Sequence, residues 1–197
     1  MKFIKRTLLI ILIISTVGLL FRGWFYRHLV TYKSVKIRTN YLATNIKLTD
    51  YIDANTDNQT DPDIKQIIKL GLSITSRKLN FTVDKNDTDP NKLIISKTAH
   101  CVGYASFFAT TCNYLLEKYN LSDTWTAKPQ AGQLNFLGTN IHIYFTKFFK
   151  DTKFFKDLNF IKDHDFVTIE NKKTGEILAV DPTANDYLRI DFITYNK

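Results

Sequence analysis

Three residues have the types and surroundings that thiol chemistry needs: Cys101, His164 and Asp181. Cys101 is predicted in the first turn of a helix, where unpaired N–H groups and the positive end of the helix dipole favour an anion. A thiolate attacks carbonyl carbons, and a nearby imidazole can hold it as an ion pair. The position therefore predicts a lowered pKa for the Cys101 thiol and a role as a nucleophile.

His164 and Asp181 are predicted to meet through a β-hairpin. Residues 164–171 alternate and are rich in Phe, Val and Ile, residues 172–175 form a turn that ends in Gly, and residues 176–180 return as a second strand. The first residue of one strand lies beside the last residue of its partner. We therefore expect the Asp181 carboxylate to orient the His164 imidazole, although no periodicity places the helix start beside them.

Three short blocks, taken in order, resemble the transglutaminase-like superfamily, which shares the papain-like fold. They are Cys101-Val102-Gly103-Tyr104-Ala105, His164-Asp165-Phe166-Val167 and Val180-Asp181-Pro182-Thr183. The resemblance covers about residues 94–183 and implies Cys101 as nucleophile, His164 as general base and acid, and Asp181 as the residue that orients the imidazole. Two features depart from the family's pattern: Phe166 occupies a position where Trp is more common, and the spacing from Cys101 to His164 is longer than usual. The backbone N–H of Cys101 is the oxyanion donor that we expect.

The resemblance implies an enzyme that acts on amide or peptide bonds of a peptide or protein substrate through a thioester, with no cofactor or metal. Water as acceptor makes it a protease or amidase, and an amine makes it an acyltransferase; we favour hydrolysis. The alternative is a non-catalytic interaction module of the same fold in a membrane complex. The complete Cys/His/Asp set favours the enzyme.

The remaining cysteine and histidines have simpler interpretations. Cys112 lies eleven residues after Cys101 on the same predicted helix, about 16 Å away, which excludes a disulfide between them. His142 lies between Ile141 and Ile143 in a predicted strand, and either lines the cleft or is a structural histidine, which we favour. A zinc site built from the two cysteines and a histidine lacks the short ligand spacings of such sites.

The predicted elements must position these residues. A helix opens at Asp61-Pro62 and a second runs from a Thr98 cap to about Tyr119. Strands follow at residues 124–126, 134–145, 164–171, 176–180 and 187–194. Helices followed by antiparallel strands indicate an α+β fold, with the nucleophile helix packed on an antiparallel sheet. We assign residues 1–30 to a membrane anchor, 31–60 to a polar linker and the start of the body, and 61–197 to the transglutaminase-like domain.

The charge is concentrated at the N-terminus. The chain has 197 residues and a formal charge of +8; residues 1–30 hold five bases and no acid, and the remainder holds 22 bases and 19 acids. The nearly balanced body argues against a nucleic-acid-binding protein.

Fifteen uncharged, mostly apolar residues, Thr7–Phe21, follow the basic start. As a helix they span about 22 Å, less than the ~30 Å hydrocarbon core, unless Arg22 snorkels and Trp24–Tyr26 sit at the headgroups. A cleaved signal needs small residues after the apolar run, where this chain is bulky and aromatic. A buried helix is disfavoured by basic residues at both ends. We therefore predict an uncleaved single-pass membrane anchor; the flanking charges fix no orientation, and the body is expected outside the cytoplasm.

The pentapeptide KFFKD occurs twice, at residues 147–151 and 153–157. The segment is interpreted as a connecting loop with its Phe side chains tucked beneath it. The alternative is a basic-aromatic patch that touches lipid or a partner.

Overall fold

An antiparallel sheet forms the centre of the computed structural model, which describes residues 2–56, 60–84, 86–141, 143 and 164–195. The strand order is β1-β4-β6-β7-β8, and β5 pairs with β4 as the sixth strand. The strands are β1 (Val30–Ile37), β4 (Trp125–Phe136), β5 (Thr139–Asn140), β6 (His164–Asn171), β7 (Ile177–Val180) and β8 (Ile193–Thr194). Together with the helices they make the α+β class that the sequence predicts. His142 and both KFFKD repeats lie outside the described residues.

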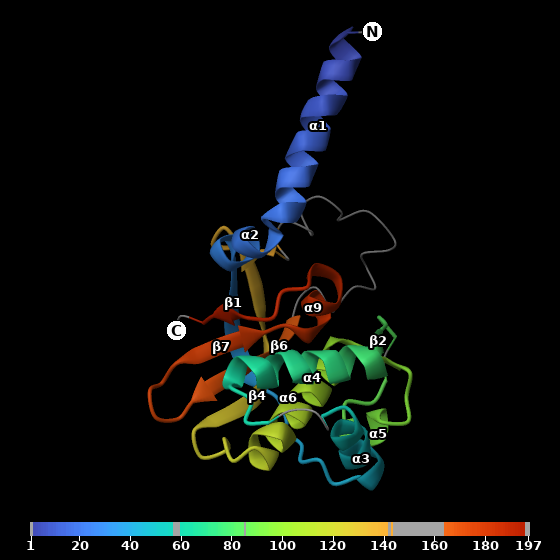
Figure 1. The fold of residues 1–197 in the computed structure, drawn as a ribbon, viewed down its shortest axis with the longest axis vertical. Coiled ribbons are helices and arrows are strands. Elements are labelled where there is room, and N and C mark those ends of the chain that lie inside the picture. Colours follow the sequence, from blue (N-terminus) through green and yellow to red (C-terminus); the bar gives the residue numbers. More distant parts are fainter. Residues whose placement is uncertain (1, 57–59, 85, 142, 144–163, 196–197) are drawn as a thin grey trace.

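Helix α6 (Cys101–Lys118) covers one face of this sheet, and α4 (Ile64–Lys78) packs on α6 (Figure 1). Ala105 and Phe108 of α6 share a buried cluster with Val167 and Ile169 of β6. The remaining helices are α1 (Lys2–Leu20), α2 (Arg22–Leu29), α3 (Ile46–Ala54), α5 (Pro90–Leu93) and α9 (Pro182–Leu188). Strands β2 (Asn80–Phe81) and β3 (Thr98–Ala99) form a small parallel pair before α6.

The predicted helix that carries Cys101 is present, but its cap differs. Thr98 lies in β3, and His100 is the N-cap, whose Nδ1 accepts the Gly103 N–H at 3.2 Å. Cys101, Ala105, Phe108, Cys112 and Leu115 recur at helical spacing along α6, and all five are buried. Gly103 allows the close approach of Leu93 and Ala99, because a Cβ there would lie about 3 Å from both side chains. The start of α6 is therefore fixed by β3 and α5.

The segment assigned to a linker belongs to the sheet. β1 pairs with β4 from Val30 opposite Phe136 to Ile37 opposite Gln130, with a register shift between Ser34 and Lys36. Val30 and Tyr32 are buried while the residues between and after them are mostly exposed. A strand with one solvated face carries polar residues at alternate positions, and this composition explains why the segment was interpreted as irregular.

The end of the chain also departs from expectation. The predicted hairpin is present, with Gly175 at φ +75° in its turn. The prediction of a final strand over 187–194 is wrong: Asp181 caps α9, and β8 begins only at Ile193.

Strand β4 also differs from the prediction. Two strands were expected over 124–145, but β4 is continuous through Pro129. Proline is tolerated there because β1 pairing stops at Gln130, so no partner needs the missing N–H on that side.

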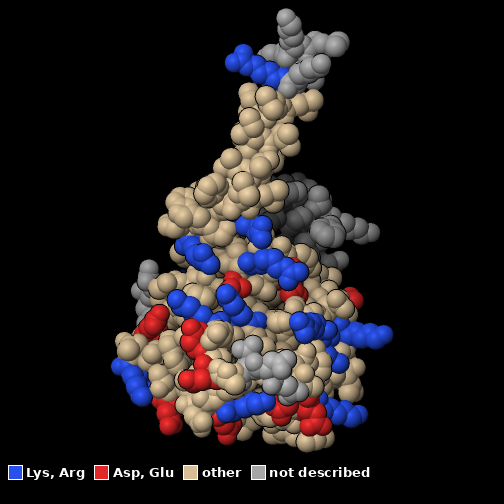
Figure 2. All heavy atoms as spheres, viewed as in Figure 1, with Lys and Arg blue, Asp and Glu red and all other residues tan. Residues whose placement is uncertain are grey.

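The N-terminal helix α1 extends away from the body (Figure 1), and its leucines and isoleucines from Leu8 to Leu20 are exposed. Figure 2 shows no lysine or arginine along the middle of this helix; basic side chains lie near its outer end and where it joins the body. Among the described residues, no single helix is long and apolar enough to cross a membrane. Arg6–Leu20 and Arg22–Leu29 meet that criterion only as a pair, which bends by 71°.

Gly132 lets β1 and β6 lie close to β4, and replacing it by alanine is expected to destabilise the sheet. A Cβ there would lie 2.4 Å from a ring carbon of Phe166 and 2.5 Å from the Lys33 carbonyl oxygen. Because one obstacle is backbone, we expect Gly132→Ala to lower the free energy of unfolding by about 3 kcal/mol. Thermal unfolding followed by circular dichroism measures this. Gly18→Ala, where no atom lies within 4 Å, is the control, and an equal melting temperature in both variants would contradict the close approach.

Candidate active site

Cys101 is the first residue of α6, and its thiol faces a carboxylate. The Sγ atom lies 3.6 Å from Oδ2 of Asp165 and donates to it. Cys101 is 5% exposed and Asp165 is 1% exposed. Arg38, just after β1, holds the same carboxylate from the other side with its Nε 2.7 Å from Oδ1 and its Nη2 3.2 Å from Oδ2. The thiol is therefore part of a Cys-Asp-Arg group in which the thiol and the carboxylate are buried and the guanidinium is partly exposed.

This environment reverses the predicted acidity of the thiol. Burial, followed by the charge of Asp165 and the hydrogen bond to it, raises the pKa of Cys101 to about 12. The end of a helix dipole is worth only about 0.3–1 kcal/mol to an anion, which is less than desolvation and an adjacent carboxylate together. The expectation of a lowered pKa is thus wrong for this structure, in which Cys101 is a neutral thiol at pH 7.

The expected contact between His164 and Asp181 is present. His164 begins β6, and its Nε2 forms a hydrogen bond and an ion pair with Oδ2 of Asp181. Asp181 follows β7 and is the N-cap of α9, so its Oδ1 accepts the Ala184 N–H at 2.9 Å. The hydroxyl of Tyr32 in β1 also donates to Oδ2, at 2.8 Å. The Asp181 carboxylate is 5% exposed and is held by three partners, His164, Ala184 and Tyr32.

The two members of this pair favour each other's charged forms. Burial lowers the pKa of His164, but the charge and hydrogen bond of Asp181 outweigh it, so the pKa of the imidazole is raised overall. For Asp181, burial raises the pKa, and the charge and hydrogen bond of His164 reverse this to a net lowering. The Ala184 N–H and the Tyr32 hydroxyl add to that lowering. His164 is therefore the proton-binding group of the site nearest to neutral pH.

The thiol and the imidazole are placed on different faces of β6. Consecutive residues of a strand point to opposite faces. Asp165 points with Val167 towards α6, and His164 points with Phe166 towards Tyr32. The structure thus joins His164 to Asp181, and joins Cys101 to the residue next to His164.

Sequence reasoning missed four residues of this region: Tyr32, Arg38, Asp165 and His100. Tyr32 and Arg38 come from the segment interpreted as a linker, where the alternation of Val30 and Tyr32 with Thr31 and Lys33 is the sequence signal of a strand. Asp165 belongs to the block that carries the resemblance, but it was given no role. His100, the residue before Cys101, is the N-cap of α6.

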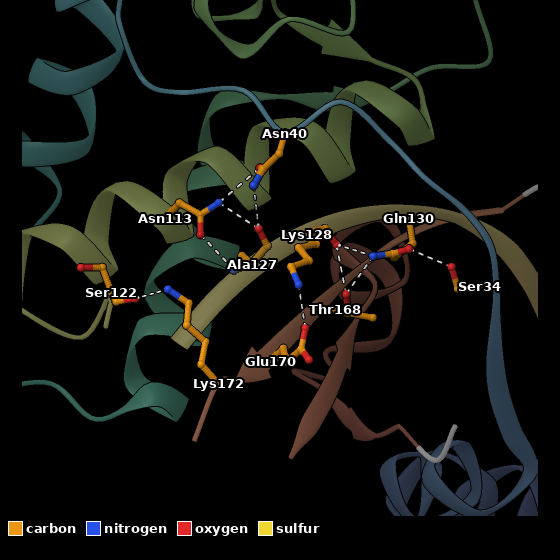
Figure 3. A network of polar contacts seen from close by, with 10 residues as sticks. All are labelled: Ser34, Asn40, Asn113, Ser122, Ala127, Lys128, Gln130, Thr168, Glu170 and Lys172. Carbon is orange, nitrogen blue, oxygen red and sulfur yellow. Dashed lines mark hydrogen bonds and ion pairs between the residues drawn. The ribbon is translucent and has the colours of Figure 1, made fainter. Parts of the chain in front are cut away.

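A network of polar side chains along β4 fixes α6 and β6 relative to each other (Figure 3). Asn113 of α6 donates to the Ala127 carbonyl and accepts the Ala127 N–H, both at 2.9 Å. Gln130 joins Ser34 of β1 to Thr168 of β6, at 2.8 and 3.0 Å. These bonds hold the helix that carries Cys101 in register with the strands that carry Asp165 and His164.

A surface pocket of about 470 Å³ lies elsewhere, lined by Asp53, Tyr114, Glu117 and Lys118. Tyr114 is thirteen residues from Cys101 on α6, about 20 Å along the helix. Lys118 and Tyr114 both bind Asp53, at 2.6 and 2.8 Å, so these groups satisfy one another. In the part of the chain that the structure describes, no three His, Cys, Asp or Glu side chains are grouped to hold a metal ion. Cys101 and Cys112 are both free thiols, as predicted.

No family model, curated protein or solved structure was found to match this chain.

Proposed function

We propose that this chain is a membrane-anchored, transglutaminase-like thiol hydrolase that acts on amide or peptide bonds through Cys101, His164 and Asp181. The observation that carries the proposal is the contact between the partly buried His164 and the buried Asp181, formed at the two positions where the motif needs it. The exposed apolar side chains of α1 support the anchor. Hydrolysis is favoured over acyl transfer to an amine.

In the proposed reaction, Asp181 binds Nε2 of His164 and leaves Nδ1 to exchange protons. Nδ1 takes the proton of the Cys101 thiol as Sγ attacks the carbonyl carbon. The C–N bond then breaks, His164 returns the proton to the leaving amine, and a thioester remains on Cys101. Water attacks the thioester with His164 as the base, which releases the acid and restores the thiol.

This reaction requires the thiol to leave Asp165. The two side chains that must meet belong to Cys101 and to the first residue of β6, whose neighbour holds the thiol. Because Asp165 and His164 are consecutive residues of β6, the movement that the proposal needs is a rotation of the Cys101 side chain from Asp165 towards His164 when substrate binds.

An activated ester tests the proposal without knowledge of the natural substrate. The full chain, reconstituted in phosphatidylcholine vesicles, is incubated with p-nitrophenyl acetate, and the acetyl group is located by peptide mass spectrometry. We expect acetylation at Cys101 and continuous release of nitrophenolate. Cys101→Ala should lose both, while Cys112→Ala, which removes a fully buried thiol from the same helix, should keep both. Equal turnover in Cys101→Ala would overturn the mechanism, and loss of the chain from vesicles in alkaline carbonate would overturn the anchor.

The second candidate is a non-catalytic interaction module of the same fold. The observation that favours it is the environment of the thiol, which is buried, donates to Asp165 and has a raised pKa. A module predicts a chain that binds vesicles and folds normally but acquires no acetyl group at Cys101. The same experiment therefore decides between the two functions.

A further inference from the structure

We infer that Tyr32 is a positioning residue for the His164–Asp181 pair, and that Tyr26 of α2 orients Tyr32. The inference deepens the proposed function and rests on it for the role of the pair in catalysis. The hydrogen-bond network on which it stands is independent of that role.

Tyr32 contacts both members of the pair. Its hydroxyl donates to Oδ2 of Asp181 at 2.8 Å, the oxygen that also binds His164. Its ring lies stacked beside the His164 ring, with centroids 6.2 Å apart and planes 27° apart, and packs on Phe166 at 4.7 Å. Tyr32 is 5% exposed. It therefore restricts both the carboxylate and the face of the imidazole.

The direction of the hydrogen bonds follows from the chemistry of the groups. An ionised carboxylate only accepts, so the Tyr32 hydroxyl gives its proton to Asp181. Tyr26 also hydrogen-bonds to the Tyr32 hydroxyl. Because that oxygen has already used its proton, Tyr26 must be the donor. The order Tyr26, Tyr32, Asp181, His164 is a chain of hydrogen bonds in one direction.

This chain connects the N-terminal segment to the site. Arg22 donates to the Leu188 carbonyl of α9 at 2.8 Å, and Leu29 accepts the Leu137 N–H at 2.8 Å. Both ends of α2 are therefore attached to the body, and α9 begins at Asp181. The helix that follows the apolar α1 thus completes the surroundings of the carboxylate.

Removal of the Tyr32 hydroxyl should change how strongly Asp181 attracts the imidazole proton. The other titratable groups that interact with the pair are Asp165, which acts on His164, and Tyr26 and Asp186, which interact with Asp181. With one donor fewer, the negative charge of Asp181 is less dispersed and holds the His164 proton more tightly. The His164 titration should therefore move to higher pH.

The test uses the full chain in detergent micelles with ¹³C-labelled histidine, and His164→Gln assigns the His164 resonance. We expect Tyr32→Phe to raise the midpoint of the His164 titration by roughly half a unit, a threefold change in the equilibrium. Tyr26→Phe should shift it in the same direction by less. Tyr195→Phe is the matched control. Tyr195 also packs on Phe166, but the hydrogen bond of its hydroxyl is with the Ser34 N–H, whereas that of Tyr32 is with Asp181.

The outcomes separate this inference from the proposed function. Midpoints in Tyr32→Phe and Tyr26→Phe equal to that of Tyr195→Phe overturn the inference, even if Cys101 is acetylated and turns over. A shifted midpoint in a chain that never acetylates Cys101 supports the positioning role and overturns only the hydrolase. If Tyr32→Phe does not fold, the Tyr26→Phe midpoint alone decides.

Discussion

Replacement of Asp165 by asparagine is expected to raise the rate of Cys101 alkylation by iodoacetamide roughly tenfold or more near pH 8, equivalent to at least one unit of thiol pKa. The carboxylate is the charged group that raises the pKa of this thiol, second only to burial. Asparagine keeps the shape of the side chain and an oxygen that can accept from Arg38. The neutral amide no longer repels a thiolate, so the thiolate fraction at a given pH rises.

The opposite change at the other end of the ion pair is the control. Arg38→Gln leaves the Asp165 charge next to the thiol without the guanidinium that binds it at 2.7 Å. We expect alkylation to become slower, because the uncompensated carboxylate disfavours a second negative charge nearby. Both variants are made in the Cys112→Ala background, so that one thiol is labelled.

The pH profile separates acidity from access. A variant that merely opens the site multiplies the alkylation rate by one factor at every pH, whereas a lowered pKa shifts the profile along the pH axis. Equal profiles in Asp165→Asn and Arg38→Gln would contradict electrostatic control of Cys101 by this ion pair.

The strongest sequence predictions concerned elements with local signals. The helix that begins at Cys101 has a buried stripe at helical spacing, and the hairpin from His164 to Val180 has alternating residues joined by a turn with Gly175. Each of these depends on contacts within one segment. The hairpin brings Asp181 near His164, as predicted, although its register places Val180 opposite Val167, so His164 lies three residues beyond the paired part of β6.

The environment of Asp181 depends on distant segments, and this part was not predicted. Tyr32 reaches the carboxylate from 149 positions earlier in the chain, through a strand whose exposed face is polar. Nothing local to Val30–Ile37 says that it pairs with β4. No helix was predicted after β7, although Asp followed by Pro is a typical start of a helix, as α9 shows.

The alternation of residues in β6 could have predicted which face of the strand the Cys101 thiol contacts. One set of alternate residues in β6 contains Val167 and Ile169, and the other contains Phe166, Thr168 and Glu170. The first set is the one that a covering helix buries. Asp165 belongs to that set and His164 does not, so the alternation already indicates Asp165 as the residue that faces Cys101.

Replacement of Asp181 by asparagine is expected to destabilise the chain most strongly in mildly acidic solution, by about 2 kcal/mol. Asparagine can still cap α9 and still accept from Tyr32, so the substitution mainly removes the charge that faces His164. Because the pKa of Asp181 is lowered by folding, its contribution is present above its unfolded value and is lost as the pH falls through the folded value. Because the pKa of His164 is raised by folding, its contribution is present below its unfolded value and is lost as the pH rises through the folded one.

The two conditions overlap between about pH 4 and pH 6.5, the unfolded values of a carboxyl and an imidazole. The difference in free energy of unfolding between wild type and Asp181→Asn should therefore be greatest in that interval and smaller on both sides of it. Thermal and urea unfolding of the full chain in micelles, repeated across the pH range, measures it. Asp63→Asn makes the same change at the N-cap of α4, where the carboxyl accepts the Gln66 N–H and no histidine, and should show no such maximum. A pH-independent deficit in Asp181→Asn would mean that the His164–Asp181 contact contributes as a neutral hydrogen bond, and the imidazolium form that the proposed reaction passes through would then gain no stabilisation from Asp181.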